Sequence, residues 1–441
     1  MIFKKKKKMP AQEGPPVKLS ARGAPTPMEN KTNLVEARQS LGFVTVKEWL
    51  ADAVTRRATR VILDFTRSGI SVRYQIDGLW HSLPGREREA GDLGLMVMKK
   101  LCNLNPKERR AKQEGELAAR FHQVEFTVKL ASQGTKDGER VLMEIVGIKD
   151  EFESMEELGM REKMQEQFKE LLGETSGLIV FSALPAGGLT TSLQVGLRGT
   201  DRYMRDFMAI VDSSKPSFPY VENIESTEYD SSKGESPDQI MKQVMLKQPD
   251  VMVVPELENA VTFNLLLQEI LDDEKLVITT LRAKDSVEAL MRLMSYKPNT
   301  ELLSKAIKGV LGQRLIRKLC LSCRRPFKPN PQLLQKLGLP ADGRIQALYR
   351  PFNAKTDRGE DGKELPACEI CGGLGYRERT AVFELLTPGD GMRHAMVHQP
   401  RLDALRAIAK QERHRGLLEE GLFHVIKGTT SLNELQRILQ T

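Results

Sequence analysis

The sequence of 441 residues predicts an α/β fold built from several parts. We expect a small N-terminal α/β domain, a larger domain with a mostly parallel sheet covered by helices, a cysteine-bearing insertion and a helical C-terminal tail. Three observations predict this organisation: apolar runs that alternate with helical segments, a strand that leads through a small-residue loop into a helix, and two Cys-x-x-Cys pairs. The length exceeds what one hydrophobic core accommodates, so roughly two to four domains are expected.

Composition excludes a membrane-spanning protein. The charged fraction of 29% and the hydrophobic fraction of 40% are typical of soluble globular proteins, and no apolar run approaches the roughly 20 residues of a membrane helix. The lysine run at residues 4–8 resembles the start of a signal peptide, but a polar, proline-rich segment follows it. We therefore expect a cytoplasmic protein. The lysine run is interpreted as a solvated tail, with contact to anionic lipid or nucleic acid as the alternative.

The N-terminal part is expected to be a disordered tail over residues 1–40, because this segment is rich in Lys, Pro, Gly and polar residues. An α/β domain is predicted over residues 41–150. Its first helix covers residues 43–58, and Asp77-Gly78 marks a tight hairpin turn. Six strands and a second helix complete the domain; the strands are residues 60–65, 71–76, 79–83, 116–121, 124–131 and 140–146, and the helix is residues 92–101.

A helical linker is predicted over residues 151–172, and a larger α/β domain over residues 173–312. The linker is charged and contains Met and Leu residues. The domain opens with a buried strand at residues 177–182, and further apolar runs follow it. Such runs, separated by helices, indicate a largely parallel sheet with helices on both faces. These runs are residues 207–211, 251–254 and 276–281.

The small-residue loop after the first of these strands resembles a phosphate-binding loop with an altered centre. Such a loop normally runs Gly, four residues, Gly-Lys-Ser/Thr. Ala183 stands for the first Gly, Gly188 for the second, Leu189 for the Lys, and Thr190 for the hydroxyl that holds magnesium. A cap for the following helix is the alternative interpretation of Thr190. The candidate nucleotide-binding residues here are Gly187, Gly188, Thr190 and Thr191.

Four of the five cysteines form two Cys-x-x-Cys pairs, Cys320 with Cys323 and Cys368 with Cys371. This pattern predicts a four-thiolate zinc site, which is structural because no coordination position is left open. Two unrelated pairs of reduced cysteines are the alternative. Cys102 stands alone and is expected to be a buried small hydrophobe. We predict a zinc-binding subdomain over residues 313–385 and a helical C-terminal domain over residues 386–441, with a cap for the last helix at residues 430–434.

Taken in order and spacing, several segments resemble the bacterial type II secretion and type IV pilus assembly ATPases, the general secretion pathway protein E family. The resemblance covers about residues 58–441. It rests on an arginine-bearing strand and turn, a segment similar to a Walker B strand, two segments very close to family sequence, and the surroundings of the second cysteine pair. These are residues 72–78, 248–256, 286–293, 309–320 and 371–380. The resemblance implies a RecA-like P-loop domain that uses ATP and Mg²⁺, together with the zinc-binding insertion.

The resemblance also implies site residues. Glu256 ends the Walker B segment and Asp212 lies in the family's acidic stretch, so both are catalytic candidates. Arg73, from the first domain, matches an arginine that approaches the phosphates of a neighbouring protomer. Glu256 as a strand-end acid and Arg73 as a surface cation are the alternative interpretations.

The departures from the family pattern cluster on its chemistry. Leu189 replaces the loop lysine, Val211 and Lys215 replace two glutamates, and Arg282 replaces a histidine. Charged residues of other family motifs are also replaced. Lys129 and Gln75 stand where the family has arginines, and Leu257-Glu258-Asn259 stands where it has Ile-Arg-Asp. Framework motifs match while catalytic positions change together. This favours a degenerate ATPase that acts as an assembly or regulatory subunit. The alternative is an active hexameric motor for protein secretion or pilus assembly, in which Arg282 or Lys215 reaches the phosphates.

Partners follow from the resemblance alone. It implies a homo-oligomer, or a mixed hexamer with an active paralogue, that works with inner-membrane platform proteins. The chain would then be cytoplasmic or peripheral at the inner face of the cytoplasmic membrane. No nucleic-acid partner is expected: the net charge is +8, and aromatics make up 5% of the chain without interleaving with basic residues. A third possible function is that of a nucleic-acid-associated protein. Strong salt-dependent DNA binding would favour it.

Overall fold

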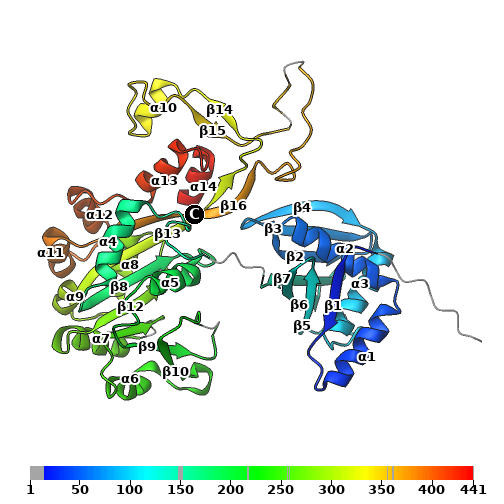
Figure 1. Cartoon of the computed structure of the whole chain (residues 1–441), viewed down its shortest axis with the longest axis horizontal. Coiled ribbons are helices and arrows are strands. Elements are labelled where there is room, and N and C mark those ends of the chain that lie inside the picture. The colour runs from blue at the N-terminus through cyan, green and yellow to red at the C-terminus, as the bar shows by residue number, and fades with distance from the viewer. Residues whose placement is uncertain are drawn as a thin grey trace, which may run out of the picture. The chain divides into compact units, whose positions relative to one another are not determined.

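The computed structural model describes residues 14–147, 152–215, 218–255, 257, 259–354, 356–359 and 362–440. The chain divides into two compact units, Met1–Glu151 and Phe152–Thr441 (Figure 1). Each unit contains a seven-stranded sheet. The two sheets differ in strand direction, and only the second leads into the loop predicted to bind phosphate.

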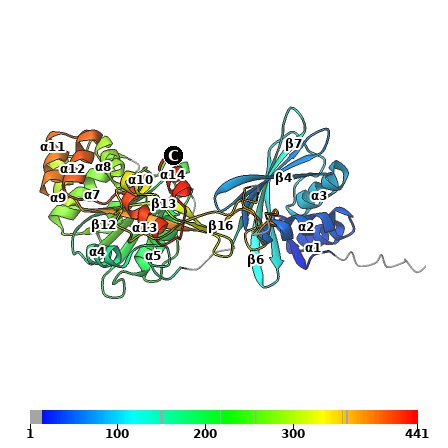
Figure 2. The same cartoon turned by 90° about the horizontal axis from the view of Figure 1, so that it is seen from above.

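The N-terminal unit is an antiparallel sheet in the order β1-β5-β6-β7-β2-β3-β4, with three helices packed on one side (Figure 2). Alternate residues of β3 are buried, as expected for a strand with one face on a core. The strands are β1 (Val17–Ala21), β2 (Ala58–Phe65), β3 (Ile70–Ile76), β4 (Leu79–Arg86), β5 (Gln113–Phe121), β6 (Val124–Gly134) and β7 (Glu139–Val146). The helices are α1 (Pro27–Arg38), α2 (Gly42–Thr55) and α3 (Arg88–Leu101).

The predicted disorder of residues 1–40 is wrong where the structure describes this segment; residues 1–13 lie outside the described part. β1 pairs with β5, and its Val17 and Leu19 are buried in the core. Thr26 caps α1 by accepting a hydrogen bond from the amide of Glu29 at 3.2 Å, and Pro27 occupies the first turn. The polar composition hid a strand that contributes only two fully buried apolar side chains.

The C-terminal unit is built on a sheet in the order β10-β9-β11-β12-β8-β13-β16. All neighbours are parallel except β16, which runs antiparallel to β13. The strands are β8 (Gly177–Ala183), β9 (Phe207–Asp212), β10 (Ile224–Tyr229), β11 (Val251–Val254), β12 (Leu276–Leu281), β13 (Ile307–Leu319) and β16 (Tyr376–Leu386). Every residue of β8 is buried, as expected for a central strand covered on both faces.

Helices cover both faces of this sheet. Leu178 and Val180 of β8 belong to a core shared with one set of helices, whereas Ile179 and Phe181 face a core shared with α4 and α5. Successive strand residues thus serve opposite cores. The helices on the two faces are α4 (Glu162–Leu172), α5 (Leu189–Arg198), α6 (Pro237–Met245), α7 (Ala260–Asp272), α8 (Ser286–Ser295), α9 (Thr300–Ala306), α11 (Asp390–His398) and α12 (Leu402–Gln411).

Three features of this unit differ from the sequence-based expectations. Residues 152–161 are not helical, because Leu158 is tied to β16 instead: its carbonyl accepts a hydrogen bond from the Ala381 amide at 2.7 Å. β10 was not predicted, since this edge strand is largely polar and exposed. β13 crosses the predicted boundary at residue 312 without a break. The cysteine-bearing segment therefore leaves the sheet after Leu319 and returns to it at Tyr376.

The last two helices, α13 (Leu417–Ile426) and α14 (Leu432–Gln440), pack on β13 and β16. The predicted cap of the final helix is confirmed, because the Ser431 hydroxyl accepts a hydrogen bond from the Glu434 amide at 3.2 Å. Glu434 is buried and accepts bonds from the guanidinium groups of Arg317 and Arg437, each at 2.7 Å. Burial opposes ionisation of this carboxyl, but the two arginines outweigh it and lower the pKa of Glu434 to about 2.

Replacing Glu434 by Gln should lower the free energy of unfolding by about 3 kcal/mol at neutral pH, because the change leaves Arg317 without its buried counter-charge. The folded-state pKa of Glu434 lies below the unfolded value. The advantage of the unmodified chain should therefore be complete above pH ~4.5 and disappear as the pH falls toward 2. Denaturant unfolding at several pH values measures this difference.

The matched control is Asp403→Asn, which neutralises an exposed carboxylate and should leave stability unchanged. A deficit for Glu434→Gln that is the same at pH 7 and at pH 2 would contradict the role assigned to the charge of Glu434.

Candidate functional site

A cleft of about 1270 Å³ opens in the C-terminal unit where its central parallel strands end. The loop after β8, the ends of β9 and β12, and the start of α5 line it. This is the edge at which open α/β sheets bind ligands. The structure brings together five of the predicted site residues along this cleft: Gly187, Gly188, Thr190, Thr191 and Asp212.

The loop between β8 and α5 is held in a tight conformation. Ala186 and Gly188 adopt positive φ angles of 59° and 83°, which at Gly188 is the conformation that glycine tolerates best. The Gly187 amide donates to the carbonyl of Leu184 at 2.9 Å, and the Gln313 side chain of β13 donates to the carbonyl of Gly187 at 2.7 Å. The neighbouring strand thus fixes the loop from outside.

The first turn of α5 leaves its backbone amides unpaired within the helix. Gly188 is the N-cap residue, no side chain caps it, and the Ser192 amide makes the first helical bond, to the carbonyl of Gly188. The interpretation of Thr190 as the helix cap is therefore wrong. The amides of Leu189, Thr190 and Thr191 have no acceptor earlier in the helix. Amides at such a helix start, with the helix dipole behind them, favour an anion.

Leu189 occupies the first position of α5, where a phosphate-binding loop has lysine. Its side chain is partly buried and packs against the apolar core shared by α4 and α5. Leu315 of β13 lies close to Gly188 and also lines the cleft. The cleft is therefore apolar where the family places an ammonium group.

Asp212, the last residue of β9, is buried and surrounded by donors. It accepts hydrogen bonds from the hydroxyl of Ser214 at 2.7 Å and from the hydroxyl of Ser231 at 2.5 Å. Lys215 lies with its Nζ 3.4 Å from Oδ2. Burial opposes ionisation, but the hydrogen bonds from Ser231 and Ser214 outweigh it, so the pKa of Asp212 lies well below its usual range. The carboxylate is ionised at neutral pH and already engaged.

Sequence reasoning missed Ser231 as a partner of Asp212. It lies in a short 3₁₀ turn, Ser231–Lys233, after β10. The hydrogen bond connects residues 19 positions apart, and no motif marks it. Val211, at the position of a family glutamate, is buried in the apolar core.

Two predicted site residues are not part of the described cleft. Glu256 lies outside the described residues. Arg73 belongs to the N-terminal unit, on β3, where it pairs with Asp64 at 3.0 Å. Asp64 also pairs with Arg140 at 2.5 Å. A role for Arg73 toward a nucleotide stays a prediction.

Cationic side chains from several elements line the cleft. Arg292 is paired with Glu288 at 2.7 Å, and Lys215 with Asp212. Arg282 follows β12 and Arg379 lies on β16; both are exposed, and neither forms an ion pair with another described residue. The guanidinium groups of Arg282 and Arg379 are therefore the candidates for supplying the positive charge that the lysine provides in a phosphate-binding loop.

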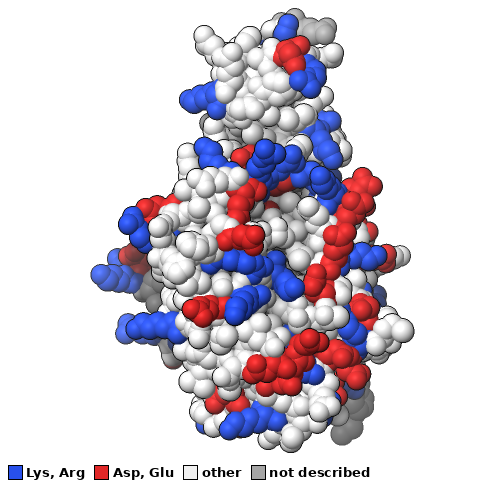
Figure 3. Space-filling model, turned by 90° about the vertical axis from the view of Figure 1, so that its left-hand side faces the viewer, with Lys and Arg blue, Asp and Glu red and all other residues white. Residues whose placement is uncertain are grey.

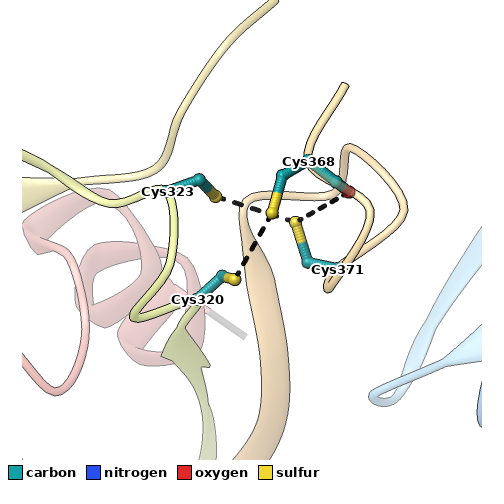
Figure 4. A group of neighbouring side chains, drawn as sticks. All are labelled: Cys320, Cys323, Cys368 and Cys371. Atoms are coloured by element: carbon teal, nitrogen blue, oxygen red, sulfur yellow. Dashed lines mark hydrogen bonds between the residues drawn. The ribbon is translucent and has the colours of Figure 1, made fainter. Parts of the chain in front are cut away.

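The four paired cysteines form one cluster, and the interpretation as two unrelated pairs is wrong. All four sulfur atoms lie within 4.8 Å of one another, with Cys320 Sγ 3.9 Å from Cys368 Sγ and Cys323 Sγ 3.7 Å from Cys371 Sγ (Figure 4). A tetrahedral zinc ion with bonds of about 2.3 Å places its sulfur ligands about 3.8 Å apart. The cluster therefore fits one structural zinc ion.

The backbone around the cluster holds the thiols in place. The Gly375 amide donates to Cys371 Sγ at 3.3 Å, and the Cys320 amide donates to the carbonyl of Gly375 at 3.0 Å. Such contacts orient metal ligands. Between the two cysteine pairs, the insertion contains β14 (Arg325–Phe327), α10 (Pro331–Lys336) and β15 (Leu348–Arg350). Cys102 lies apart in the N-terminal unit, where burial raises the pKa of its thiol to about 12, as expected for a small hydrophobe.

Purified protein should carry about one zinc ion per chain, and Cys368→Ser combined with Cys371→Ser should remove it and lower the melting temperature. The physical reason is loss of the metal cross-link at the base of the insertion between β13 and β16. Elemental analysis and thermal unfolding measure the two effects. Cys102→Ala is the matched control and should keep its zinc; full zinc content in the double variant would contradict the assignment.

The fold and the cleft together define a class. A parallel sheet whose central strand leads through a small-residue loop into a helix, with a cleft at that point, is the RecA-like P-loop arrangement. Solved structures agree: the Legionella pneumophila ATPase DotB matches with a TM-score of 0.58 at 12% identity, over 90% of this chain and 95% of that one. The DotB of Yersinia pseudotuberculosis matches with a TM-score of 0.56 at 11% identity, over 89% of this chain and 92% of that one.

The family follows from the sequence comparison. The family model described as Type II/IV secretion system protein matches residues 38–437, and the chain belongs to this family. It is 26% identical over 403 residues to the type IV pilus assembly ATPase PilB of Thermus thermophilus, covering 91% of this chain but 43% of that protein. It is 27% identical over 394 residues to the type II secretion system protein E of Dickeya dadantii, covering 89% of this chain and 74% of that protein. The predicted resemblance is confirmed.

Two further properties of the described part of the chain concern its helices and its surface charge. Among the described helices, none is both long and apolar enough to cross a lipid bilayer. On the face drawn in Figure 3, Lys and Arg side chains are intermixed with Asp and Glu. That face therefore carries charges of both signs.

Proposed function

We propose that this chain is a non-hydrolysing or weakly hydrolysing member of its family. It acts as an assembly or regulatory subunit of a type II secretion or type IV pilus-like system. The observation that carries the proposal is Leu189 at the first position of α5. Its side chain is apolar and packs against the core shared by α4 and α5, whereas a phosphate-binding loop has at this position a lysine whose ammonium group contacts the nucleotide.

Phosphoryl transfer needs positive charge on the transferred group, a metal ion and an oriented water molecule. Leu189 supplies no charge. The oxygens of Asp212 are engaged by Ser214, Ser231 and Lys215, so this carboxylate is poorly placed to orient water. Val211 has no carboxyl group to supply an acid, and its side chain is buried among apolar neighbours. Losses at separate points of one cleft are harder to compensate than a single loss.

The alternative is an active hexameric motor, and one observation favours it. Arg282 and Arg379 line the cleft without an ion pair among the described residues. In this alternative a guanidinium group replaces the lysine ammonium, and Glu256 acts with a bound Mg²⁺ ion.

The proposal includes partners that follow from the family. Similar proteins are named for type II secretion and type IV pilus assembly. We propose a homo-oligomer, or a mixed hexamer with an active paralogue, that contacts inner-membrane platform proteins from the cytoplasmic side. The zinc ion stabilises the insertion, and ATP with Mg²⁺ is the candidate ligand of the cleft. Gly187, Gly188, Thr190 and Thr191 would hold its phosphates.

The test is phosphate release from ATP by zinc-loaded, full-length protein in the presence of Mg²⁺. We expect release that is absent or only slightly above that of the Glu256→Gln variant, because the charge that stabilises the transition state is absent. Magnesium-dependent release that continues over many turnovers, and that Glu256→Gln abolishes, would overturn the proposal and establish the active motor. In that case Arg282→Ala and Arg379→Ala, compared separately, identify the guanidinium that replaces the lysine.

A further inference from the structure

The cleft retains one half of a nucleotide site and has lost the other. In phosphate-binding loops the backbone amides surround the α and β phosphates, while the lysine reaches the β and γ phosphates. These two contributions are separable here because the loop backbone is intact and Leu189 replaces the lysine. The inference below rests on the proposed function, since it concerns the same cleft.

The backbone of the loop and the first amides of α5 form the part of the site that would contact the α and β phosphates. Gly187 is bonded to Leu184 within the loop and to Gln313 of β13 from outside. A Cβ added at Gly187 would lie 2.7 Å from the carbonyl oxygen of Leu184, so the loop is closed to larger residues there. The amides at the start of α5 lack helical acceptors, and the cleft they border is large enough for a nucleotide.

The γ-phosphate half offers little to a third phosphate. Leu189 and Leu315 present apolar surface beside the loop. Asp212 places an ionised carboxylate in the same cleft, and Lys215 is already paired with it. Arg282 and Arg379 are exposed, so water screens their attraction for a phosphate.

We propose that the cleft is a nucleoside-diphosphate site, which binds ADP more tightly than ATP. A diphosphate places its charge on the retained amides, whereas the additional phosphate of ATP brings charge that finds no buried cation among the described residues of the cleft. At equal concentrations of the two nucleotides, most of the chain would then be in the diphosphate-bound state.

The test is calorimetric titration of zinc-loaded, full-length protein with ADP, with ATP and with the non-hydrolysable β,γ-imido analogue of ATP, each with Mg²⁺. We expect ADP to bind about tenfold more tightly than ATP or the analogue, the effect of one missing charge-assisted contact. Leu189→Lys should tighten binding of the analogue by about tenfold and remove the preference for ADP. The matched control is Leu246→Lys, which adds a lysine at an exposed leucine after α6, outside the cleft, and should leave both affinities unchanged.

Each outcome separates this inference from the proposed function. The analogue binding as tightly as ADP would overturn the inference and leave the absence of hydrolysis intact. Phosphate release accompanied by a preference for ADP would overturn the proposed function and support the inference. Failure of both nucleotides to bind, in protein that retains zinc and a sharp thermal transition, would overturn the inference and the nucleotide proposed as the ligand of the cleft, and would leave the absence of hydrolysis intact. The comparison on the unmodified chain decides the matter even where Leu189→Lys does not fold.

Discussion

The pairing of β13 between β8 and β16 is the contact on which the C-terminal unit depends. This strand of 13 residues runs parallel to β8, and Gln313 reaches from it to the phosphate loop. Further along, Arg317 meets the buried Glu434 of α14. The strand ends at Leu319, directly before the first cysteine of the cluster. This one strand therefore positions the loop, the last helix and the first pair of clustered cysteines.

That arrangement keeps the conformation of the loop independent of the side chain at position 189. The loop conformation depends on Gln313 and on backbone bonds, none of which requires the lysine side chain. Leu189 even adds apolar contact to the core. At Asp212 the serine donors and Lys215 satisfy a buried carboxylate without any ligand. At Leu189, and at Asp212 with Lys215, the side chains are satisfied within the chain, so the folded state does not rely on a bound nucleotide at these two points.

Local patterns in the sequence predicted the parts of the fold that are encoded locally. The strand, loop and helix around Gly188 and the spacing of the cysteines are motifs of this kind. Prediction failed where long-range contacts decide. β1 forms because β5, about 100 residues later, offers it an edge, and Ser231 reaches Asp212 only through the pairing of β10 with β9. The domain boundary at residue 312 was misplaced because basic residues that resemble the start of an insertion belong to the longest strand of the sheet.

The pairing of β13 with β16 allows the segment between these two strands to change without disturbing the sheet. Leu319 is paired with Tyr376, so the chain leaves the sheet and returns to it at neighbouring points. The cysteines lie at this neck, and a bound metal would close the loop at its base rather than along its length. The entropy of closing a loop grows only slowly with its length. The segment between the two cysteine pairs can thus lengthen, shorten or change its sequence while the sheet stays the same. It could be replaced by a different segment without altering the fold of the unit.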